Sequence, residues 1–275
     1  MVPEVVKDFL NLGCGSRFHP EWTNLDIQPL SSRVRRWDLQ KDLPFPDESF
    51  DLVYHSHVLE HFSKADGLSF LKRCFRILRR GGTIRVAVPD LERIARLYIE
   101  ALDKSLNGDP VWRERYEWIL LEMYDQTVRN YSGGEMLSYM QRDPMPEREF
   151  VAARMGCELM ASAVPPAKSP PERVGEYGFN ALRGYFSRKL ARIALGPDGL
   201  RAHDVGRFRL SGEIHCWMYD AYSLGKTLQE AGFSNPQRRE AGESAIPDWK
   251  GFNLDTEPDG TAYKPDSLYL EATKA

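Results

Sequence analysis

The chain has 275 residues, a formal net charge of −3 and 42% hydrophobic residues. These totals support one large globular domain, or a domain with an insertion, and they exclude a general nucleic-acid-binding protein, which needs a basic excess. The four cysteines form no CxxC pair, which argues against a zinc ribbon or a disulfide framework and predicts a reduced, cytoplasmic setting. We find no signal-peptide pattern and no apolar run near the ~20 residues that a membrane helix needs.

The first predicted strand, residues 9–12, ends in two glycines that are one residue apart. Gly13 and Gly15 allow a tight turn and a close approach of a ligand to bare backbone. A second predicted strand, residues 22–27, carries Asp26 near its end. A carboxylate at this position can accept hydrogen bonds from both hydroxyls of a ribose. The two strand ends therefore predict a nucleoside-binding site.

Three more strands are predicted at residues 34–39, 50–55 and 83–88. Between the strands at residues 50–55 and 83–88, the apolar spacing predicts a helix. Its pattern begins again at Ser63, and the segment from Arg79 to Gly82 is expected to cap its C-terminal end. Strands that alternate with helices or loops predict a mostly parallel α/β sheet, which binds its ligands at the carboxyl ends of the strands. Five residues are expected at those ends, namely Gly13, Gly15, Asp26, Asp38 and His55.

The pattern changes between Asp90 and Ile214, where helical spacing and clustered prolines predict a largely helical insertion. A helix at residues 219–231 and strands at residues 235–240 and 267–272 are expected to complete the sheet. We therefore expect residues 1–90 and 215–275 to form one domain, and residues 91–214 to form an insertion that covers the site and selects the substrate.

Taken in order, these motifs resemble the class I S-adenosylmethionine-dependent methyltransferases, and among them the broad type 11 subgroup. The motifs are Leu-Asn-Leu-Gly-Cys-Gly, Asn-Leu-Asp-Ile, Trp-Asp-Leu, His-Val-Leu-Glu-His and Leu-Arg-Arg-Gly-Gly-Thr. The resemblance covers roughly residues 7–90 and 215–273. It implies a Rossmann-like, mostly parallel seven-stranded sheet with helices on both faces, a helical insertion between the fifth strand and the last helix, and S-adenosyl-L-methionine as the cofactor.

The resemblance also implies roles for individual residues. The glycine turn would lie along the methionine part of the cofactor, Asp26 would hold the ribose, and Asp38 and Leu39 would contact the adenine. His55 and Ser56 would face the methionine end and the sulfonium, and Asn11 stands where the family has an acidic residue. The cofactor-binding residues predicted in this way are Asn11, Gly13, Cys14, Gly15, Asp26, Ile27, Asp38, Leu39, His55 and Ser56.

His57 and His215 are the candidate catalytic residues, as a general base or as groups that orient the acceptor. The string His57-Val-Leu-Glu60-His61 also fits the H-x-x-E-H pattern of a metallopeptidase helix, so a zinc hydrolase is an alternative. No downstream helix offers an obvious third ligand, and we predict no metal site. In the simpler interpretation, His61 packs against the sheet and Glu60 forms a local hydrogen bond.

The predicted function is methyl transfer to an oxygen or nitrogen atom of a small acceptor or glycan. The arginine-rich segment at residues 183–209 favours an anionic or polyhydroxylated acceptor. The family resemblance is compatible with a role in sugar or surface-polysaccharide modification. Nucleic acid is not an expected partner, and the pattern does not predict an oligomeric state. A second alternative is a partner protein that binds the cofactor without catalysis. A nicotinamide dinucleotide is disfavoured because Phe18 stands where its third glycine belongs.

Overall fold

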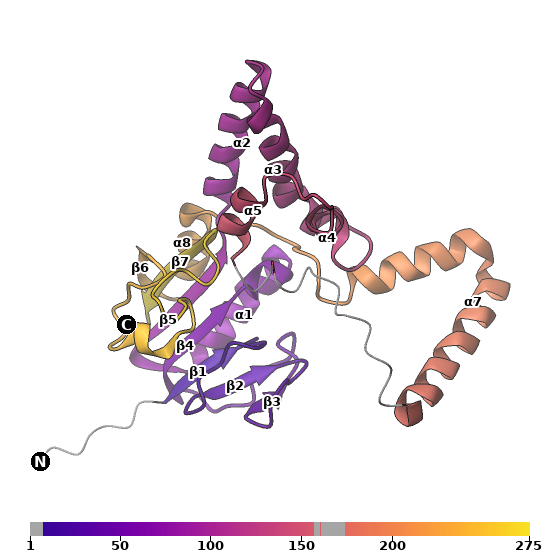
Figure 1. Ribbon diagram of the computed structural model, residues 1–275. Coiled ribbons are helices and arrows are strands. Elements are labelled where there is room, and N and C mark those ends of the chain that lie inside the picture. Colours follow the sequence, from indigo (N-terminus) through magenta and orange to yellow (C-terminus); the bar gives the residue numbers. More distant parts are fainter. Residues whose placement is uncertain (1–7, 157–159, 161–173) are drawn as a thin grey trace, which may run out of the picture.

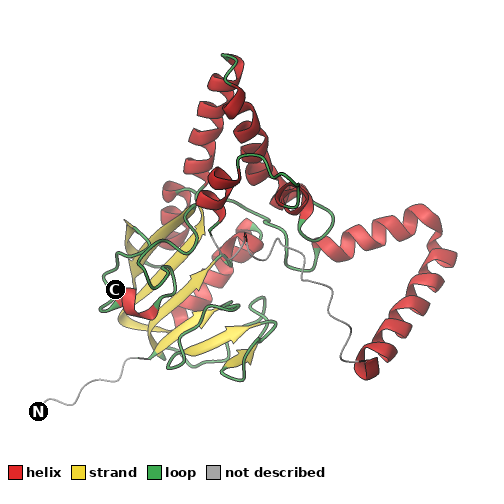
Figure 2. Cartoon of the chain, in the orientation of Figure 1, coloured by secondary structure: helices red, strands yellow, loops and turns green. Residues whose placement is uncertain are grey.

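The computed structural model describes residues 8–156, 160 and 174–275. A seven-stranded sheet forms its centre, in the order β3-β2-β1-β4-β5-β7-β6 (Figures 1 and 2). Neighbouring strands from β3 to β5 are parallel, and β7 is antiparallel to both β5 and β6. The predicted mostly parallel α/β sheet is therefore confirmed. The strands are β1 (Phe9–Leu12), β2 (Thr23–Asp26), β3 (Val34–Arg36), β4 (Phe50–Ser56), β5 (Leu78–Pro89), β6 (Ser234–Arg239) and β7 (Ser267–Thr273).

One face of the sheet is covered by α1 (Lys64–Ile77) and α8 (Ala221–Glu230). Alternate strand residues such as Leu10, Leu12 and Val53 point to this face and are fully buried, because successive side chains of a strand lie on opposite sides. The Ser63 side chain caps α1 by accepting a hydrogen bond from the Asp66 amide. A capping box in which Asp220 takes part begins α8.

The predicted cap of α1 at Arg79 to Gly82 is wrong. The helix ends at Ile77, and Leu78 already has extended backbone angles. Leu78 pairs with Phe50, and the Gly81 amide donates to the Lys274 carbonyl 2.7 Å away. Pairing with β4 and with the C-terminal strand thus extends β5 back through the glycines, where the helical spacing alone had indicated a helix end.

The other face of the sheet is covered by the β6–β7 connection (residues 240–266), which includes the short 3₁₀ helix η2 (Trp249–Phe252). Trp22, Leu52 and Tyr54 pack there against Trp249 and Leu254. The two faces of the sheet are therefore covered differently. The helices α1 and α8 pack on one face, and the β6–β7 connection with its 3₁₀ turn packs on the other.

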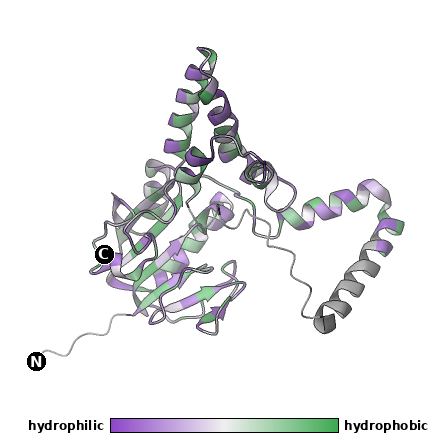
Figure 3. Ribbon diagram, viewed as in Figure 1, coloured by the Kyte–Doolittle hydropathy of each residue, from purple (hydrophilic) through white to green (hydrophobic). Residues whose placement is uncertain are grey.

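The predicted helical insertion lies between β5 and α8. Its helices among the described residues are α2 (Leu91–Leu106), α3 (Pro110–Val128), α4 (Gly134–Met140), α5 (Arg148–Met155) and α7 (Val174–Arg209). Trp118 and Ile119 of α3 and Tyr139 of α4 form a separate apolar core. Hydrophobic and hydrophilic bands alternate along α2 and α3 (Figure 3). The division into a cofactor domain and a substrate cap stays a prediction.

Helix α7 extends away from the rest of the molecule (Figure 1). It bends at Gly196, whose φ of +70° is not helical, and Pro197 follows. In the part of the chain that the structure describes, no helix combines the length and the apolar character needed to cross a membrane.

Candidate cofactor and acceptor site

The glycine turn after β1 has the left-handed backbone that its sequence predicts. Gly13 has a φ of +66° and Gly15 a φ of +52°. A Cβ atom at position 13 would lie 2.4 Å from Val58 Cγ2, whereas a Cβ at position 15 would meet no atom within 4 Å. Glycine is thus required at position 13 by its backbone and by its neighbour. At position 15 the backbone alone requires it, and the space beside it is open to a ligand.

Asp26 lies beside this turn, at the end of β2. One carboxylate oxygen accepts a hydrogen bond from the Gly15 amide at 2.8 Å, and the other accepts from the Gln28 amide at 2.7 Å. An ionised carboxylate can accept about four hydrogen bonds, so two backbone bonds fix its orientation and leave capacity for the hydroxyls of a ligand. The two predicted halves of the nucleoside site are therefore adjacent.

A cavity of about 230 Å³ opens next to the turn, where the strand order reverses between β1 and β4. Six of the predicted residues line it, namely Asn11, Gly13, Cys14, Gly15, Ser56 and His57. The other lining residues were missed by the sequence analysis: Ser16, Arg17, Tyr54, Leu254, Tyr263 and Lys264. Three of these belong to the β6–β7 connection, which has neither a periodic pattern nor a motif that could have placed it here.

Arg17 ties the glycine turn to the β6–β7 connection. Its guanidinium lies over the Tyr263 ring, 3.9 Å from the centroid, and forms an ion pair with Glu257. The Arg17 carbonyl accepts a hydrogen bond from the Asn11 side-chain amide at 3.0 Å. The residues that follow β1 are thus held in place from both sides of the cavity.

Five predicted cofactor residues lie outside the lining of this cavity: Asp26, which borders the glycine turn, His55, and the three residues Ile27, Asp38 and Leu39. Leu39 is close, since its Cδ1 lies 3.6 Å from the Cβ position of residue 13. The Asp38 carboxylate accepts a hydrogen bond from the Gln40 amide, and the Ile27 side chain is 54% exposed. All three follow β2 or β3, on the side of the glycine turn where an adenine is expected, and their roles stay predictions.

The structure does not bring His55 to the cavity. Ser56 lines it, and because neighbouring residues of a strand face opposite sides, His55 points to the α1 face. There its ring meets Phe70 with 5.2 Å between centroids, and neither ring nitrogen has a hydrogen-bond partner among the described residues. Complete burial lowers the pKa of His55 to about 4, so the ring is neutral at pH 7.

His57 begins a cluster of polar side chains at the end of β4. It has a φ of +54°, its Nε2 lies 2.8 Å from the Ser267 hydroxyl, and its Nδ1 lies 3.3 Å from a Glu60 carboxylate oxygen. The string from His57 to His61 does not form an α-helix, because only the three residues of η1 (Leu59–His61) are helical and they form a 3₁₀ turn. The metallopeptidase arrangement, with both histidines on one α-helical face, is therefore absent from this segment.

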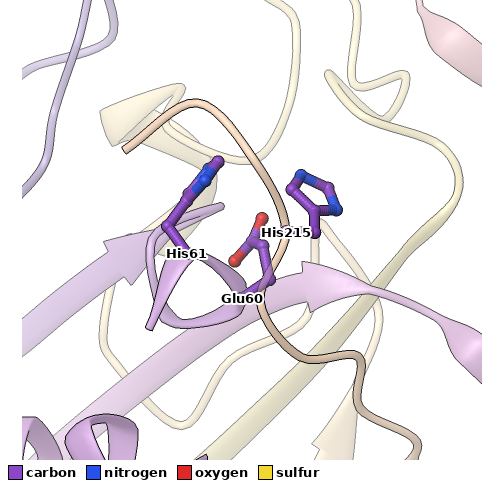
Figure 4. A group of neighbouring side chains, drawn as sticks. All are labelled: Glu60, His61 and His215. Carbon is purple, nitrogen blue, oxygen red and sulfur yellow. The ribbon is translucent and has the colours of Figure 1, made fainter. Parts of the chain in front are cut away.

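His215 joins the same cluster from far along the chain (Figure 4). Its amide donates to the Gln126 carbonyl of α3, and the next amide, of Cys216, donates to the Glu60 carbonyl. The rings of His61 and His215 lie edge to face, 4.9 Å apart. The sequence analysis selected His57 and His215 separately, and the fold places both around Glu60.

The ionisation of this cluster follows from its burial. Desolvation is the main cause that lowers the pKa of His57 to about 4 and that of His215 to about 3. Glu60 is completely buried in the same cluster, and its carboxylate faces the rings of His57, His61 and His215.

A second cavity of about 410 Å³ lies on the other side of the cluster. His61 and Ile214 line it, together with the basic side chains Arg73 and Arg209. The Nη2 of Arg73 donates to the Leu39 carbonyl, and its buried Nε has no hydrogen-bond partner within the described residues. This cavity therefore offers two guanidinium groups, of which Arg209 also donates to backbone carbonyls, and one carboxylate, Asp66, close to the histidine cluster.

Residues 20–86, which run from before β2 into β5, match the family model described as a methyltransferase domain. A curated relative is a probable S-adenosylmethionine-dependent methyltransferase from Mycolicibacterium smegmatis, 29% identical. The alignment covers 30% of this chain and only 38% of that relative.

Two solved structures cover nearly all of this chain. One is an S-adenosylmethionine-dependent methyltransferase from Archaeoglobus fulgidus (10% identity, 98% of this chain and 87% of that one, TM-score 0.40). The other is a putative methyltransferase of Haloferax volcanii, solved in complex with the activator Trm112 (12% identity, 98% and 82%, TM-score 0.39). Such TM-scores are too low to compare the sites. The matched segment and the curated relative thus show that this part of the chain is similar to S-adenosylmethionine-dependent methyltransferases.

Proposed function

We propose that this protein binds S-adenosylmethionine in the cavity beside Gly13 and Gly15 and transfers its methyl group to an oxygen or nitrogen atom of a small acceptor. The observation that carries this proposal is the hydrogen bond between the Gly15 amide and the Asp26 carboxylate. It joins an open glycine turn and an acidic strand end at the point where the strand order reverses, which is where open α/β sheets bind nucleotides.

The residues present fit this cofactor. The open space beside Gly15 allows a ligand to contact the backbone, and Asp26 retains acceptor capacity for two hydroxyls. Asn11 and Ser56 supply polar atoms to the cavity wall for the amino-acid end, and Leu39 and Asp38 follow on the adenine side. When bound, S-adenosylmethionine supplies a methyl group that is already activated by a sulfonium.

The protein therefore has mainly to orient the acceptor and to exclude water. His57 lines the cofactor cavity and is neutral at pH 7, so it can accept a hydrogen bond or a proton from an acceptor atom. Its contact with the Ser267 hydroxyl at 2.8 Å fixes the ring. The β6–β7 connection closes one side of the cavity through Tyr263 and Lys264.

The acceptor is proposed to be anionic or polyhydroxylated. Arg73 and Arg209 line the cavity on the far side of the histidine cluster, and guanidinium groups favour phosphate and carboxylate oxygens. A sugar or a surface polysaccharide would satisfy this chemistry. The helical insertion, residues 91–214, is proposed to select the acceptor, since it contributes Arg209 and Leu210 to that cavity.

The test is calorimetry with S-adenosylmethionine and S-adenosylhomocysteine, followed by a methyl-transfer assay on a panel of sugars, phosphosugars and carboxylates. We expect saturable binding of both nucleosides and a labelled product from at least one acceptor. Lack of binding would refute the cofactor assignment. Binding without a product from any acceptor would instead favour a protein that holds the cofactor for a partner.

A further inference from the structure

The carboxylate of Glu60 is the least satisfied charged group of the described structure. Its side chain is completely buried, and neither oxygen has a hydrogen-bond partner among the described residues. His57 approaches one oxygen at 3.3 Å but does not form a hydrogen bond of normal geometry. An isolated buried carboxylate costs several kcal/mol by a general estimate, so such a group calls for a cation nearby.

Of the cations near this cluster, Lys264 lies toward His57 on the side of the cofactor cavity, and Arg129 is engaged with other acids. Arg129, the arginine that influences the neighbouring His215, forms ion pairs with Glu213 at 3.2 Å and with Asp125 at 3.8 Å. The groups that the structure places closest to the Glu60 carboxylate are the imidazole rings of His57, His61 and His215.

His61 is held in the tautomer that a metal ligand needs. Its Nδ1 lies 3.0 Å from the Ile214 carbonyl, which can only accept, so Nδ1 carries the proton in the neutral ring. The lone pair is then on Nε2. A ligating histidine typically has this second contact, because it fixes both the orientation of the ring and its basicity.

His215 contacts Gln126 of α3. The Gln126 side-chain nitrogen lies 3.1 Å from His215 Nε2, and because an amide nitrogen only donates, Nε2 accepts in this arrangement. Rotation of the amide by 180° presents its oxygen instead, so that Nε2 donates and Nδ1 keeps a lone pair. The same segment is fixed by the backbone hydrogen bonds from His215 to Gln126 and from Cys216 to Glu60.

The ligand atoms of Glu60, His61 and His215 all lie within 4.8 Å of one another (Figure 4). Around a tetrahedral zinc ion with ligand distances of about 2.1 Å, donor atoms are roughly 3.4 Å apart, so small side-chain rotations close the set. Two imidazoles and one carboxylate form a donor set for zinc, manganese or iron(II), and three protein ligands leave coordination positions open.

We infer that Glu60, His61 and His215 bind one divalent cation of the zinc or manganese class, and that its open positions coordinate oxygen atoms of the acceptor. The part concerning the acceptor rests on the proposed function, whereas the metal site itself does not. His61 lines the basic cavity and His57, next to Glu60, lines the cofactor cavity, so the cation lies between the two. Acceptors with adjacent hydroxyl or carboxylate oxygens suit such a site.

The experiment measures metal alone. The full-length protein is treated with a chelator and titrated with Zn²⁺ and Mn²⁺ by calorimetry, and Co²⁺ is added to record its visible absorption. We expect one ion per chain and a Co²⁺ spectrum typical of nitrogen and oxygen ligands. Glu60→Gln and His215→Ala should each weaken Zn²⁺ binding at least tenfold. The control His203→Ala, at an exposed histidine of α7, should bind as the native chain does.

The inference is overturned if the native chain binds none of these ions stoichiometrically, or if Glu60→Gln and His215→Ala bind Zn²⁺ as tightly as it does. Glu60→Gln preserves the shape of the side chain, and circular dichroism identifies any variant that has not folded. The Co²⁺ spectrum of the native chain tests the ligand set without any variant. Titration with S-adenosylhomocysteine keeps the two proposals separate, since nucleoside binding without metal refutes only this one, and metal without nucleoside refutes only the proposed function.

Discussion

Two buried clusters of charge, one on a face of the sheet and one beyond the end of β4, differ in how far their acids are satisfied. Under the β6–β7 connection, Arg85 is fully buried and binds both Asp255 and Glu271 at 2.7 Å. Asp255 also accepts from the Tyr54 hydroxyl, and Glu271 from the Ala245 amide and from Arg239. Beyond the end of β4, the Glu60 carboxylate faces the rings of His57, His61 and His215 and has no hydrogen bond within the described residues.

The difference indicates two uses of a buried acid. The Arg85 cluster fixes the β6–β7 connection, whose carbonyls at residues 240, 241 and 243 also accept from the same guanidinium. This connection supplies one wall of the cofactor cavity. The Glu60 carboxylate holds no other segment by a hydrogen bond among the described residues. Its cluster borders both cavities through His57 and His61. The first cluster therefore supports the fold, and the second is available to a ligand.

Arg85→Met is the change expected to have the largest effect on stability. It leaves Asp255 and Glu271 buried without their cation, which typically costs about 3–5 kcal/mol. Urea denaturation should show the loss as a lower midpoint. The control is Arg79→Met, whose side chain is 38% exposed and pairs with Asp8 and Asp51, and which should cost at most about 1 kcal/mol. Equal effects of the two variants would contradict a structural role for the buried cluster.

Arg154→Met applies the same test to the helical insertion. Arg154 forms a two-pronged, buried pair with Glu122 of α3, which also accepts from the Trp118 indole. Loss of the cation should cost about 3 kcal/mol. Because this pair belongs to the core of the insertion, S-adenosylhomocysteine binding by the folded variant should be unchanged. A large loss of nucleoside affinity would show that the insertion shapes the cofactor site.

Glu60→Gln and Glu271→Gln are expected to change stability in opposite directions. Glu271→Gln removes the charge from a satisfied network and should destabilise the metal-free protein by about 2 kcal/mol. Glu60→Gln removes a buried carboxylate that has no hydrogen-bond partner among the described residues, and should be neutral or stabilising by about 1 kcal/mol. Thermal melts in the presence of a chelator measure both. If Glu60→Gln destabilised the protein as much as Glu271→Gln, both carboxylates would contribute to stability in the same way, and the proposed difference between the clusters would be wrong.

Asp26→Ala should weaken nucleoside binding without unfolding the protein. Hydrogen bonds to a charged acceptor contribute about 2 kcal/mol, so calorimetry should show a roughly thirtyfold loss in affinity for S-adenosylhomocysteine. Asp47→Ala is the control, since its exposed carboxylate pairs with Arg76 far from the cavity lining. Unchanged affinity of the Asp26→Ala variant would show that Asp26 does not bind the ribose.

Replacement of Arg188, Arg192 and Arg207 by alanine should have the smallest effect. These residues lie on α7, which extends away from the sheet (Figure 1). We expect a several-fold rise in the KM for an anionic acceptor and no change in cofactor affinity. An equal loss of cofactor affinity would mean that α7 acts on the fold and not on the acceptor.

The sheet and the glycine turn could be predicted because their signals are local. Apolar runs ended by glycine, by Asp26 or by Pro89 define several of the strands, whereas the strand order is known only from the structure. Pairing with neighbouring strands changed one boundary, since β5 extends back to Leu78. The alternation of side chains along β4, which separates His55 from Ser56, is also present in the sequence, although the family motif placed both residues at one site.

The rest of the site depends on contacts between distant residues. Tyr263 and Lys264 reach the cavity because the Arg85 cluster holds the β6–β7 connection against the sheet, and no local pattern indicates this. His215 meets Glu60 through backbone hydrogen bonds to η1 and α3, across more than 80 residues of helical insertion. The sequence marked His57, Glu60 and His61 as a motif, but the position of the third ligand depends on the tertiary structure.

A crystal structure of the protein with S-adenosylhomocysteine tests the central claim most directly. The account predicts that the nucleoside lies against the backbone of Gly13 and Gly15, with its ribose hydroxyls on the Asp26 carboxylate and its amino-acid end toward Asn11 and Ser56. A nucleoside bound at any other edge of the sheet, or one whose ribose makes no contact with Asp26, would contradict it.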